Sequence, residues 1–382
     1  MTAVDTTMIR YTPVRTKKGG LQSLSSLTGL RWYAAFAVFV SHGMGQVARD
    51  FHHQSHLLET LLGPLGEHGV AFFFVLSGFI IAWASRDGDT SRAFYRRRVL
   101  KIFPSHLITA AVMIPVLAVP VSALISYLPN FLLIKDWSPT WSTLLQLNFP
   151  SWSLCSEMLF YATFPLAYPL IKKIEGKYVW WTIAILMAAL IGIQVAIYMF
   201  VPGGSGFAGM YAARGSVSQF WLSYMFPPTR LLEFFVGVMF ARLVMSGMWK
   251  NISVTWPLLA CVLCYALTLT SVVPETFKTS LIMVPPLAAL IATVAVRNMN
   301  GITGFASGRL GIWLGDISFA FYLAQYPTMA VLSLVIRGKS VSPVGSLVFL
   351  VASLVLSIIF AAALYHRVDK PIMDRWAYGR KR

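Results

Sequence analysis

Two ionisable residues in the first apolar run have the spacing of a site that handles a proton. Arg31 and His42 stand eleven residues apart. Eleven helical steps of about 100° bring both side chains to one face, roughly 16 Å apart along the axis. An imidazole near neutral pKa can take a proton from a hydroxyl and return it. The pair predicts a cation at the entrance of this segment and a general base deeper in it. A snorkelling arginine and a structurally bonded histidine form the alternative that spacing alone leaves open.

A carboxylate and a group of cations stand in other parts of the chain. Glu157 lies about one turn inside an apolar run. An acid there needs a partner, so we expect an imidazole or guanidinium on a facing helix. Arg97, Arg98 and Lys101 form a basic cluster, with Arg97 and Lys101 on one helical face at i, i+4. Such a cluster attracts phosphate groups, although anchoring at a membrane surface explains it equally well.

The three cysteines offer weaker candidates. Cys155 stands two residues before Glu157 and could act as a nucleophile, but nothing nearby in the sequence would depress its pKa. Cys261 and Cys264 have the spacing of a redox or metal motif. Because they fall inside a predicted apolar helix, we interpret them as buried thiols and predict no metal site or disulfide.

Two further patterns favour structural roles. Arg230 and Glu233 form an i, i+3 pair that can neutralise itself within one helix. Ser77-Gly78 offers a small surface on which another helix can approach closely. Both are predicted to serve packing.

The elements that carry these residues are apolar and long. The chain has 382 residues, of which 57% are hydrophobic and only 12% charged, and its mean hydropathy is +0.67. Runs of roughly 18 to 25 apolar residues recur, which is the length needed to cross a bilayer. We therefore predict an all-α, polytopic membrane protein of about ten transmembrane helices. The predicted spans are 27–47, 65–85, 101–121, 153–171, 178–200, 226–246, 253–273, 279–297, 309–336 and 342–366.

The basic residues indicate how these helices are oriented. The net charge of +17 could suggest a nucleic-acid partner, but the lysines and arginines lie in short clusters between the apolar runs. Most of them fall in alternate loops, so both termini are predicted to be cytoplasmic. The predicted organisation is a cytoplasmic N-terminal segment (1–26), a transmembrane domain (27–366) and a basic cytoplasmic tail (367–382).

Taken in order, these motifs resemble those of acyltransferase family 3, the bacterial integral-membrane O-acyltransferases. The resemblance covers nearly the whole chain. Its motifs are Leu27-Thr28-Gly29-Leu30-Arg31 with His42, Phe73-Phe74-Val75-Leu76-Ser77-Gly78-Phe79, the basic segment Arg97 to Pro104, Trp152-Ser153-Leu154 with Glu157, and Gly315-Asp316-Ile317-Ser318 with Tyr322-Leu323 and Pro327. Three positions depart from the family pattern: Lys101 replaces an arginine, Ala71 stands where many members carry an acid, and Gln325 takes the place of a frequent histidine.

The resemblance implies an acyl-CoA donor, with acetyl-CoA expected as co-substrate and with no metal or permanently bound cofactor. The phosphates of CoA are expected on Arg97, Arg98, Lys101 and Arg31. His42 would then act as general base on the acceptor hydroxyl. Glu157 would orient or charge-stabilise the imidazole.

The acceptor implied by the resemblance is a sugar hydroxyl. It belongs either to a surface polysaccharide or to a glycosylated secondary metabolite such as a macrolide. The expected location is the bacterial cytoplasmic membrane, in contact with the lipid bilayer and without nucleic acid. A transporter or flippase of a lipid-linked or secreted glycan is the rival hypothesis. The sequence shows no evident inverted repeat, which counts against it.

Overall fold

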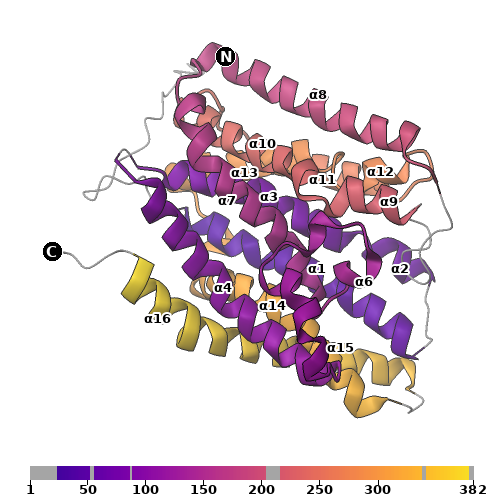
Figure 1. Ribbon diagram of the computed structural model, residues 1–382. Helices are drawn as coiled ribbons and strands as arrows, with labels where there is room; N and C mark the ends of the chain where they lie inside the picture. The colour runs from indigo at the N-terminus through magenta and orange to yellow at the C-terminus, as the bar shows by residue number, and fades with distance from the viewer. Residues whose placement is uncertain (1–23, 52–55, 87, 204–215, 338–340, 378–382) are drawn as a thin grey trace.

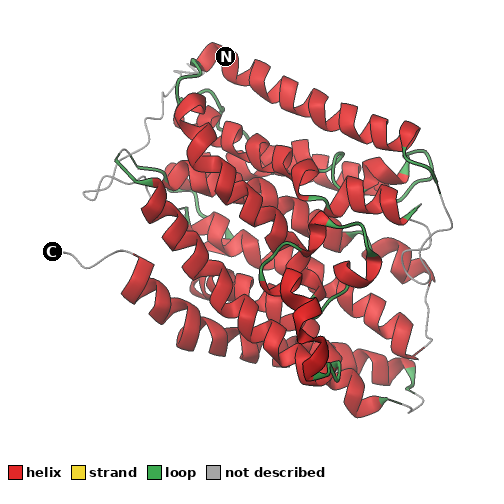
Figure 2. Cartoon of the chain, viewed as in Figure 1, coloured by secondary structure: helices red, strands yellow, loops and turns green. Residues whose placement is uncertain are grey.

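The computed structural model describes residues 24–51, 56–86, 88–203, 216–337 and 341–377. These residues form helices and loops and contain no strand, as Figure 2 shows. The all-α prediction is therefore confirmed. The long helices are α1 (Ser25–Phe51), α3 (Leu65–Ala84), α4 (Ser91–Val116), α7 (Trp152–Ile171), α8 (Gly176–Phe200), α10 (Pro227–Met245), α11 (Thr255–Thr268), α13 (Val284–Met299), α14 (Arg309–Ile336) and α15 (Pro343–Leu364).

Short helical segments fill the connections between the long helices. They occur above all between α4 and α7. The short α-helices are α2 (His56–Leu62), α5 (Leu128–Phe131), α6 (Trp141–Leu144), α9 (Val217–Phe220), α12 (Glu275–Lys278) and α16 (Lys370–Ile372). The 3₁₀ and π segments are Val121–Tyr127, Lys135–Trp137, Phe149–Ser151, Trp221–Met225, Phe305–Ser307, Tyr365–Asp369 and Met373–Ala377.

Each of the ten predicted apolar runs overlaps one of the long helices, although several boundaries differ. By length and composition, six helical stretches are able to cross a membrane: Leu57–Ala84, Ser91–Val116, Phe149–Ile171, Gly176–Phe200, Arg309–Ile336 and Pro343–Ala377. The apolar helices Thr255–Thr268 and Val284–Met299 are shorter. α1 and α10, which carry Arg31, His42, Arg230 and Glu233, fall outside the set of six.

The third predicted span differs most from the structure. It was placed at 101–121, whereas α4 runs over Ser91–Val116. The helix begins earlier because the side chain of Thr90 caps it, accepting a hydrogen bond from the Ala93 amide at 3.2 Å. The basic cluster is therefore helical, which fixes the directions of Arg97, Arg98 and Lys101.

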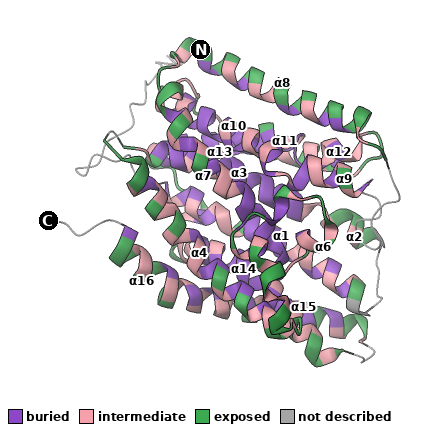
Figure 3. Cartoon of the chain, viewed as in Figure 1, coloured by how far each residue is buried: buried purple, intermediate pink, exposed green. Residues whose placement is uncertain are grey.

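The core lies where α1, α3, α10 and α14 meet. α3 packs on α10 and on α1, and α1 packs on α14. Burial is concentrated in these helices, as Figure 3 shows, while α8 lies at one edge of the molecule and α15 with α16 at the opposite edge (Figure 1). A peripheral helix with one exposed apolar face suits contact with lipid.

Glycines set the closest helix contact. A Cβ at Gly78 of α3 would fall on the carbonyl oxygen of Phe234 in α10, and a Cβ at Gly237 would fall on that of Val75. The contact is reciprocal, so each backbone fits only where the other helix has no side chain. The predicted packing role of Ser77-Gly78 is confirmed.

The charged pair in α10 is also structural. Arg230 and Glu233 form an ion pair of 2.6 Å, and both side chains are buried. The Arg230 guanidinium lies over the rings of Phe74 and Tyr224, each 5.0 Å from its centroid. The pair neutralises itself inside the bundle, as predicted.

Candidate active site

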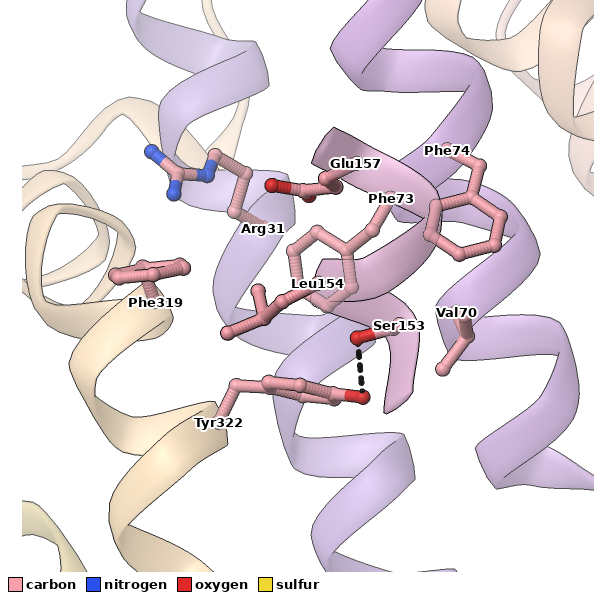
Figure 4. Close-up of a pocket in the computed structure, with 9 residues that line it drawn as sticks. All are labelled: Arg31, Val70, Phe73, Phe74, Ser153, Leu154, Glu157, Phe319 and Tyr322. Carbon is pink, nitrogen blue, oxygen red and sulfur yellow. Dashed lines mark hydrogen bonds between the residues drawn. The ribbon is translucent and has the colours of Figure 1, made fainter. Parts of the chain in front are cut away.

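A cavity of about 50 Å³ lies between α1, α3, α7 and α14. Arg31 of α1 and Glu157 of α7 lie beside each other at one end of it (Figure 4). At the other end the hydroxyls of Ser153 and Tyr322 are hydrogen-bonded at 2.8 Å. The volume holds a few water molecules or the end of a thin chain, so a bulkier group would stay outside. The lining residues are Arg31, Val70, Phe73, Phe74, Ser153, Leu154, Glu157, Phe319 and Tyr322.

The sequence predicted an imidazole or a guanidinium on a facing helix as the partner of Glu157. The structure places the Arg31 guanidinium of α1 beside this carboxylate, and the His42 imidazole lies elsewhere. The Glu157 carboxylate accepts a hydrogen bond of 2.8 Å from the Tyr161 hydroxyl, one turn along α7. The cations within electrostatic range of this carboxylate are Arg31, Arg98 and Lys101. Glu157 is therefore the centre of a cationic group, and its place is at the Arg31 end of the cavity.

Two cations of α4 lie over this end of the cavity. The Arg98 guanidinium sits 5.4 Å from the ring centroid of Phe94 and 5.6 Å from that of Tyr161. The Lys101 ammonium lies 5.0 Å from the ring centroid of Phe319, which lines the cavity. We call the end of the bundle that holds Arg31, Arg98 and Lys101 the basic end.

Arg97 is directed elsewhere. It forms an ion pair with Asp89, in the loop before α4. Lys101 instead faces Asp369 of the C-terminal helix, 3.8 Å away. The two cations that lie together at the cavity are thus Arg98 and Lys101, at i, i+3, and not Arg97 and Lys101 at i, i+4.

His42 lies deeper along α1, beyond the residues that line the cavity. Its ring is 6.3 Å from that of Phe149. Its Nδ1 atom is buried and has no hydrogen-bond partner. With the rise of about 16 Å that separates it from Arg31, His42 belongs to a different layer from Glu157. The structure brings Arg31, Arg98, Lys101 and Glu157 together and leaves His42 apart from them.

Two residues at the basic end, Tyr161 and Asp369, were not predicted as site residues. Tyr161 could have been found, because it stands at i+4 from Glu157. Asp369 could not: it accepts a hydrogen bond of 2.6 Å from Ser105, which is 264 residues away. The side chain of Asp369 is 1% exposed and holds Lys101 at the basic end.

The loop between α4 and α7 is held by a buried lysine, Lys135. The Lys135 ammonium donates to the carbonyls of Gln146, Asn148 and Phe149 at 3.3 to 3.5 Å. Asp136 beside it is fully buried, and its carboxyl interacts with the Cys155 thiol. Cys155 thus faces this loop and does not line the cavity. The described residues contain no group of three His, Cys, Asp or Glu side chains that could hold a metal ion.

Comparisons with known proteins agree with this architecture. Residues 24–366 match the family model described as an acyltransferase domain. The chain is similar to the acyltransferase MdmB of Streptomyces mycarofaciens, with 35% identity over 375 residues that cover 94% of this chain and 93% of the relative. It is also similar to the exopolysaccharide production protein ExoZ of Rhizobium meliloti, with 25% identity over 330 residues, 81% of this chain and 90% of the relative. No solved structure matches it. The chain belongs to acyltransferase family 3.

Proposed function

We propose that the protein transfers an acetyl or other short acyl group from acyl-CoA to a sugar hydroxyl. The observation that carries the proposal is the basic end. Three cations from two helices surround one carboxylate there, at one end of a narrow cavity within the bundle. Cations at that end suit a polyanionic donor.

The donor fits the cavity by its shape. CoA carries its phosphates at one end and its thioester at the other, joined by a long, thin arm. The phosphates would rest against Arg31, Arg98 and Lys101. The arm would enter the cavity between Glu157 and Tyr322 and widen it on the way. Arg97, engaged by Asp89, would contribute less than the sequence suggested.

His42 is the proposed general base. Its free, buried Nδ1 supports this role, because an unpartnered nitrogen can accept the proton of a hydroxyl. The acceptor oxygen attacks the thioester carbonyl, the carbon–sulfur bond breaks, and the proton passes through the imidazole to the departing thiolate. The products are an ester and free CoA. Glu157 would hold the cations of the basic end in place and would not orient the imidazole.

The proposed setting is the bacterial cytoplasmic membrane, with the basic end facing the cytoplasm where acyl-CoA is made. Ten helices would cross, with both termini on the cytoplasmic side. The six helical stretches long and apolar enough to span support a multi-pass membrane protein. The excess of lysine and arginine in alternate loops supports the proposed orientation.

The proposed acceptor is a glycan or a glycoside. The name of the relative from Rhizobium meliloti, an exopolysaccharide production protein, supports a polysaccharide. A glycosylated secondary metabolite such as a macrolide presents the same chemical group, a sugar hydroxyl next to others. The mechanism is the same for both.

Thiol release tests the proposal. Purified protein in detergent is given acetyl-CoA with a panel of methyl glycosides and one glycosylated macrolide. We expect free thiol and an acetyl ester in equal amounts. His42→Ala should lower the rate at least 100-fold. His68→Ala is the matched control, because His68 is also a buried histidine but is bonded to Thr268 in another part of the bundle. The His68→Ala variant should keep its activity. Undiminished turnover in the folded His42→Ala variant would contradict the assignment.

A further inference from the structure

The register of two helices places a second group of polar side chains in the layer of His42. Phe39 of α1 lies against Phe321 of α14, with ring centroids 5.8 Å apart. Further along, Gln46 donates a hydrogen bond of 3.0 Å to Ser333. His42 lies between the two α1 residues, and Gln325 stands one turn after Phe321. Gly43, next to His42, faces Met329 of α14, and Gln325 stands one turn before Met329. Gln325 therefore lies within about one helical turn of the level of His42.

Phe149 links the same layer to the loop before α7. Its ring lies 6.3 Å from His42 and 6.3 Å from Tyr326 of α14. Asn148, the residue before it, is fully buried. Three elements thus meet around the imidazole: α1, α14 and this loop.

The side chain of Asn148 is bound to a backbone carbonyl of α14 that has no partner within the helix. Pro327 has no amide hydrogen, so the carbonyl of Leu323, four residues earlier, loses its helical partner. The side-chain amide of Asn148 donates to that carbonyl at 2.9 Å. Its nitrogen must face Leu323, so its oxygen faces away. That Oδ1 atom is buried and has no hydrogen-bond partner.

The side chain of Gln325 is bound in the same way, with its nitrogen bonded to a backbone carbonyl and its oxygen without a partner. Its Nε2 donates to the carbonyl of Tyr322 at 3.0 Å. The side chain is fully buried, and Oε1 has no partner. Tyr322 also lines the donor cavity, so Gln325 stands one turn of α14 beyond the place where that cavity ends.

The layer therefore offers two buried amide oxygens and one imidazole nitrogen without partners. Buried acceptors without donors are costly, and most so within a membrane. Groups that bring several hydroxyl donors without bringing charge would complete them. An anion would be disfavoured, because the amide oxygens would repel it.

We propose that this layer is the acceptor subsite and that it takes a sugar carrying neighbouring hydroxyls. The inference rests on the proposed function and adds the residues that hold the acceptor. One hydroxyl donates to Gln325 Oε1 and a second to Asn148 Oδ1. The reacting hydroxyl then faces Nδ1 of His42, with the thioester arriving from the Tyr322 side.

The test compares two glutamines of the same kind. Gln325→Leu removes the proposed acceptor atom, together with the amide that donates to Tyr322, and leaves a buried side chain of similar volume. Gln194→Leu is the matched control. Like Gln325, Gln194 is fully buried, donates to a backbone carbonyl (that of Ser223) and has an Oε1 atom without a partner. It lies elsewhere, between α8 and the segment Trp221–Met225. The probes are the methyl glycosides and the glycosylated macrolide of the thiol assay.

In Gln325→Leu we expect the KM for the glycoside to rise at least 10-fold. The KM for acetyl-CoA at saturating glycoside should stay within about 2-fold of the wild type, because the donor contacts other residues. Thermal stabilisation of the protein by the glycoside should be lost as well. Gln194→Leu should match the wild type in all three measurements.

The outcomes separate this proposal from the proposed function. A wild-type protein that is stabilised by a glycoside through Gln325 but releases no thiol would keep the subsite and reject acyl transfer. Equal KM and equal stabilisation in wild type and Gln325→Leu would reject the subsite while leaving acyl transfer in place. A wild type that neither binds nor acylates any probe would overturn the sugar subsite, and the free oxygens would then hold structural water only.

Discussion

At the residue scale, the proposed binding of acyl-CoA depends on which cations of α4 face the cavity. Arg98 lies over Tyr161, whose hydroxyl bonds Glu157, whereas its neighbour Arg97 is paired with Asp89. We predict that Arg98→Ala raises the KM for acetyl-CoA about 10-fold, the loss of roughly 1.4 kcal/mol of donor binding. Arg97→Ala should change the same KM less than about 3-fold. Steady-state kinetics with varied acetyl-CoA measures both.

The comparison has a direct internal control. Both variants remove one arginine from adjacent positions of one helix, so effects of net charge are matched. A larger effect for Arg97→Ala than for Arg98→Ala would show that the donor contacts the outer face of α4. The assignment of the basic end would then be wrong.

At the scale of elements, the contact of α3 with α10 should be sensitive to a single methyl group. Gly237→Ala puts a Cβ onto the carbonyl of Val75. Because both partners are backbone, neither can move aside cheaply, and we predict a loss of about 1 to 3 kcal/mol in stability. The melting temperature in detergent measures it.

The matched variant for that prediction is Gly192→Ala on the peripheral helix α8. A Cβ there meets nothing within 4 Å. Alanine favours the helix by up to about 1 kcal/mol over glycine, so stability should be unchanged or slightly higher. Equal destabilisation by the two substitutions would mean that α3 and α10 do not approach as the structure describes.

The buried carboxyl of Asp136, in the loop between α4 and α7, should make the stability of the protein depend on pH. Burial raises the pKa of the Asp136 carboxyl to about 6, with Lys135 opposing the shift, from an ordinary value of 3.8. A raised pKa in the folded state means that the folded protein binds this proton more tightly. The stabilisation is therefore complete below about pH 4 and is lost as pH rises through about 6, by roughly 3 kcal/mol.

Asp136→Asn removes the titrating group and keeps its shape. We predict that melting temperatures of the variant fall less between pH 4 and pH 7 than those of the wild type, because the variant has no carboxyl at position 136 to titrate. Superimposable profiles of variant and wild type would rule out this carboxyl as the source of the pH dependence.

At the scale of the whole molecule, the apolar runs predicted the helices because each run is long and bounded by polar residues. The start of α4 was wrong because its first three turns are charged, and hydropathy cannot detect a helix that leaves the apolar layer. Arg31 and Glu157 were both predicted as site residues. A guanidinium was one of two partners predicted for Glu157, but the sequence could not identify Arg31 as that partner. The choice depends on how α7 packs against α1, which no local pattern encodes.

The polar residues around His42 are a second case in which the sequence does not predict a contact between distant segments. The sequence predicts that Pro327 leaves the carbonyl of Leu323 without its helical hydrogen bond. It does not indicate which residue donates to that carbonyl instead. Asn148 does so from 175 residues away. Such a bond is fixed only when the loop before α7 is folded onto α14.

The orientation of the bundle can be tested by labelling. In a cysteine-free background, Ser91→Cys and Val121→Cys place thiols at exposed positions at the first residue of α4 and beyond its last residue. An impermeant maleimide applied to intact cells should label position 121 and not position 91, because the basic end is proposed to face the cytoplasm. Labelling of position 91 from outside would reverse the orientation.

The most direct measurement is a cryo-EM map of the protein with an unreactive acetyl-CoA analogue bound. The account predicts that the phosphates contact Arg31, Arg98 or Lys101 and that the acyl end lies past Glu157, beside Tyr322 and toward His42. Phosphate density at the opposite end of the bundle, or an acyl group outside the cavity, would contradict it.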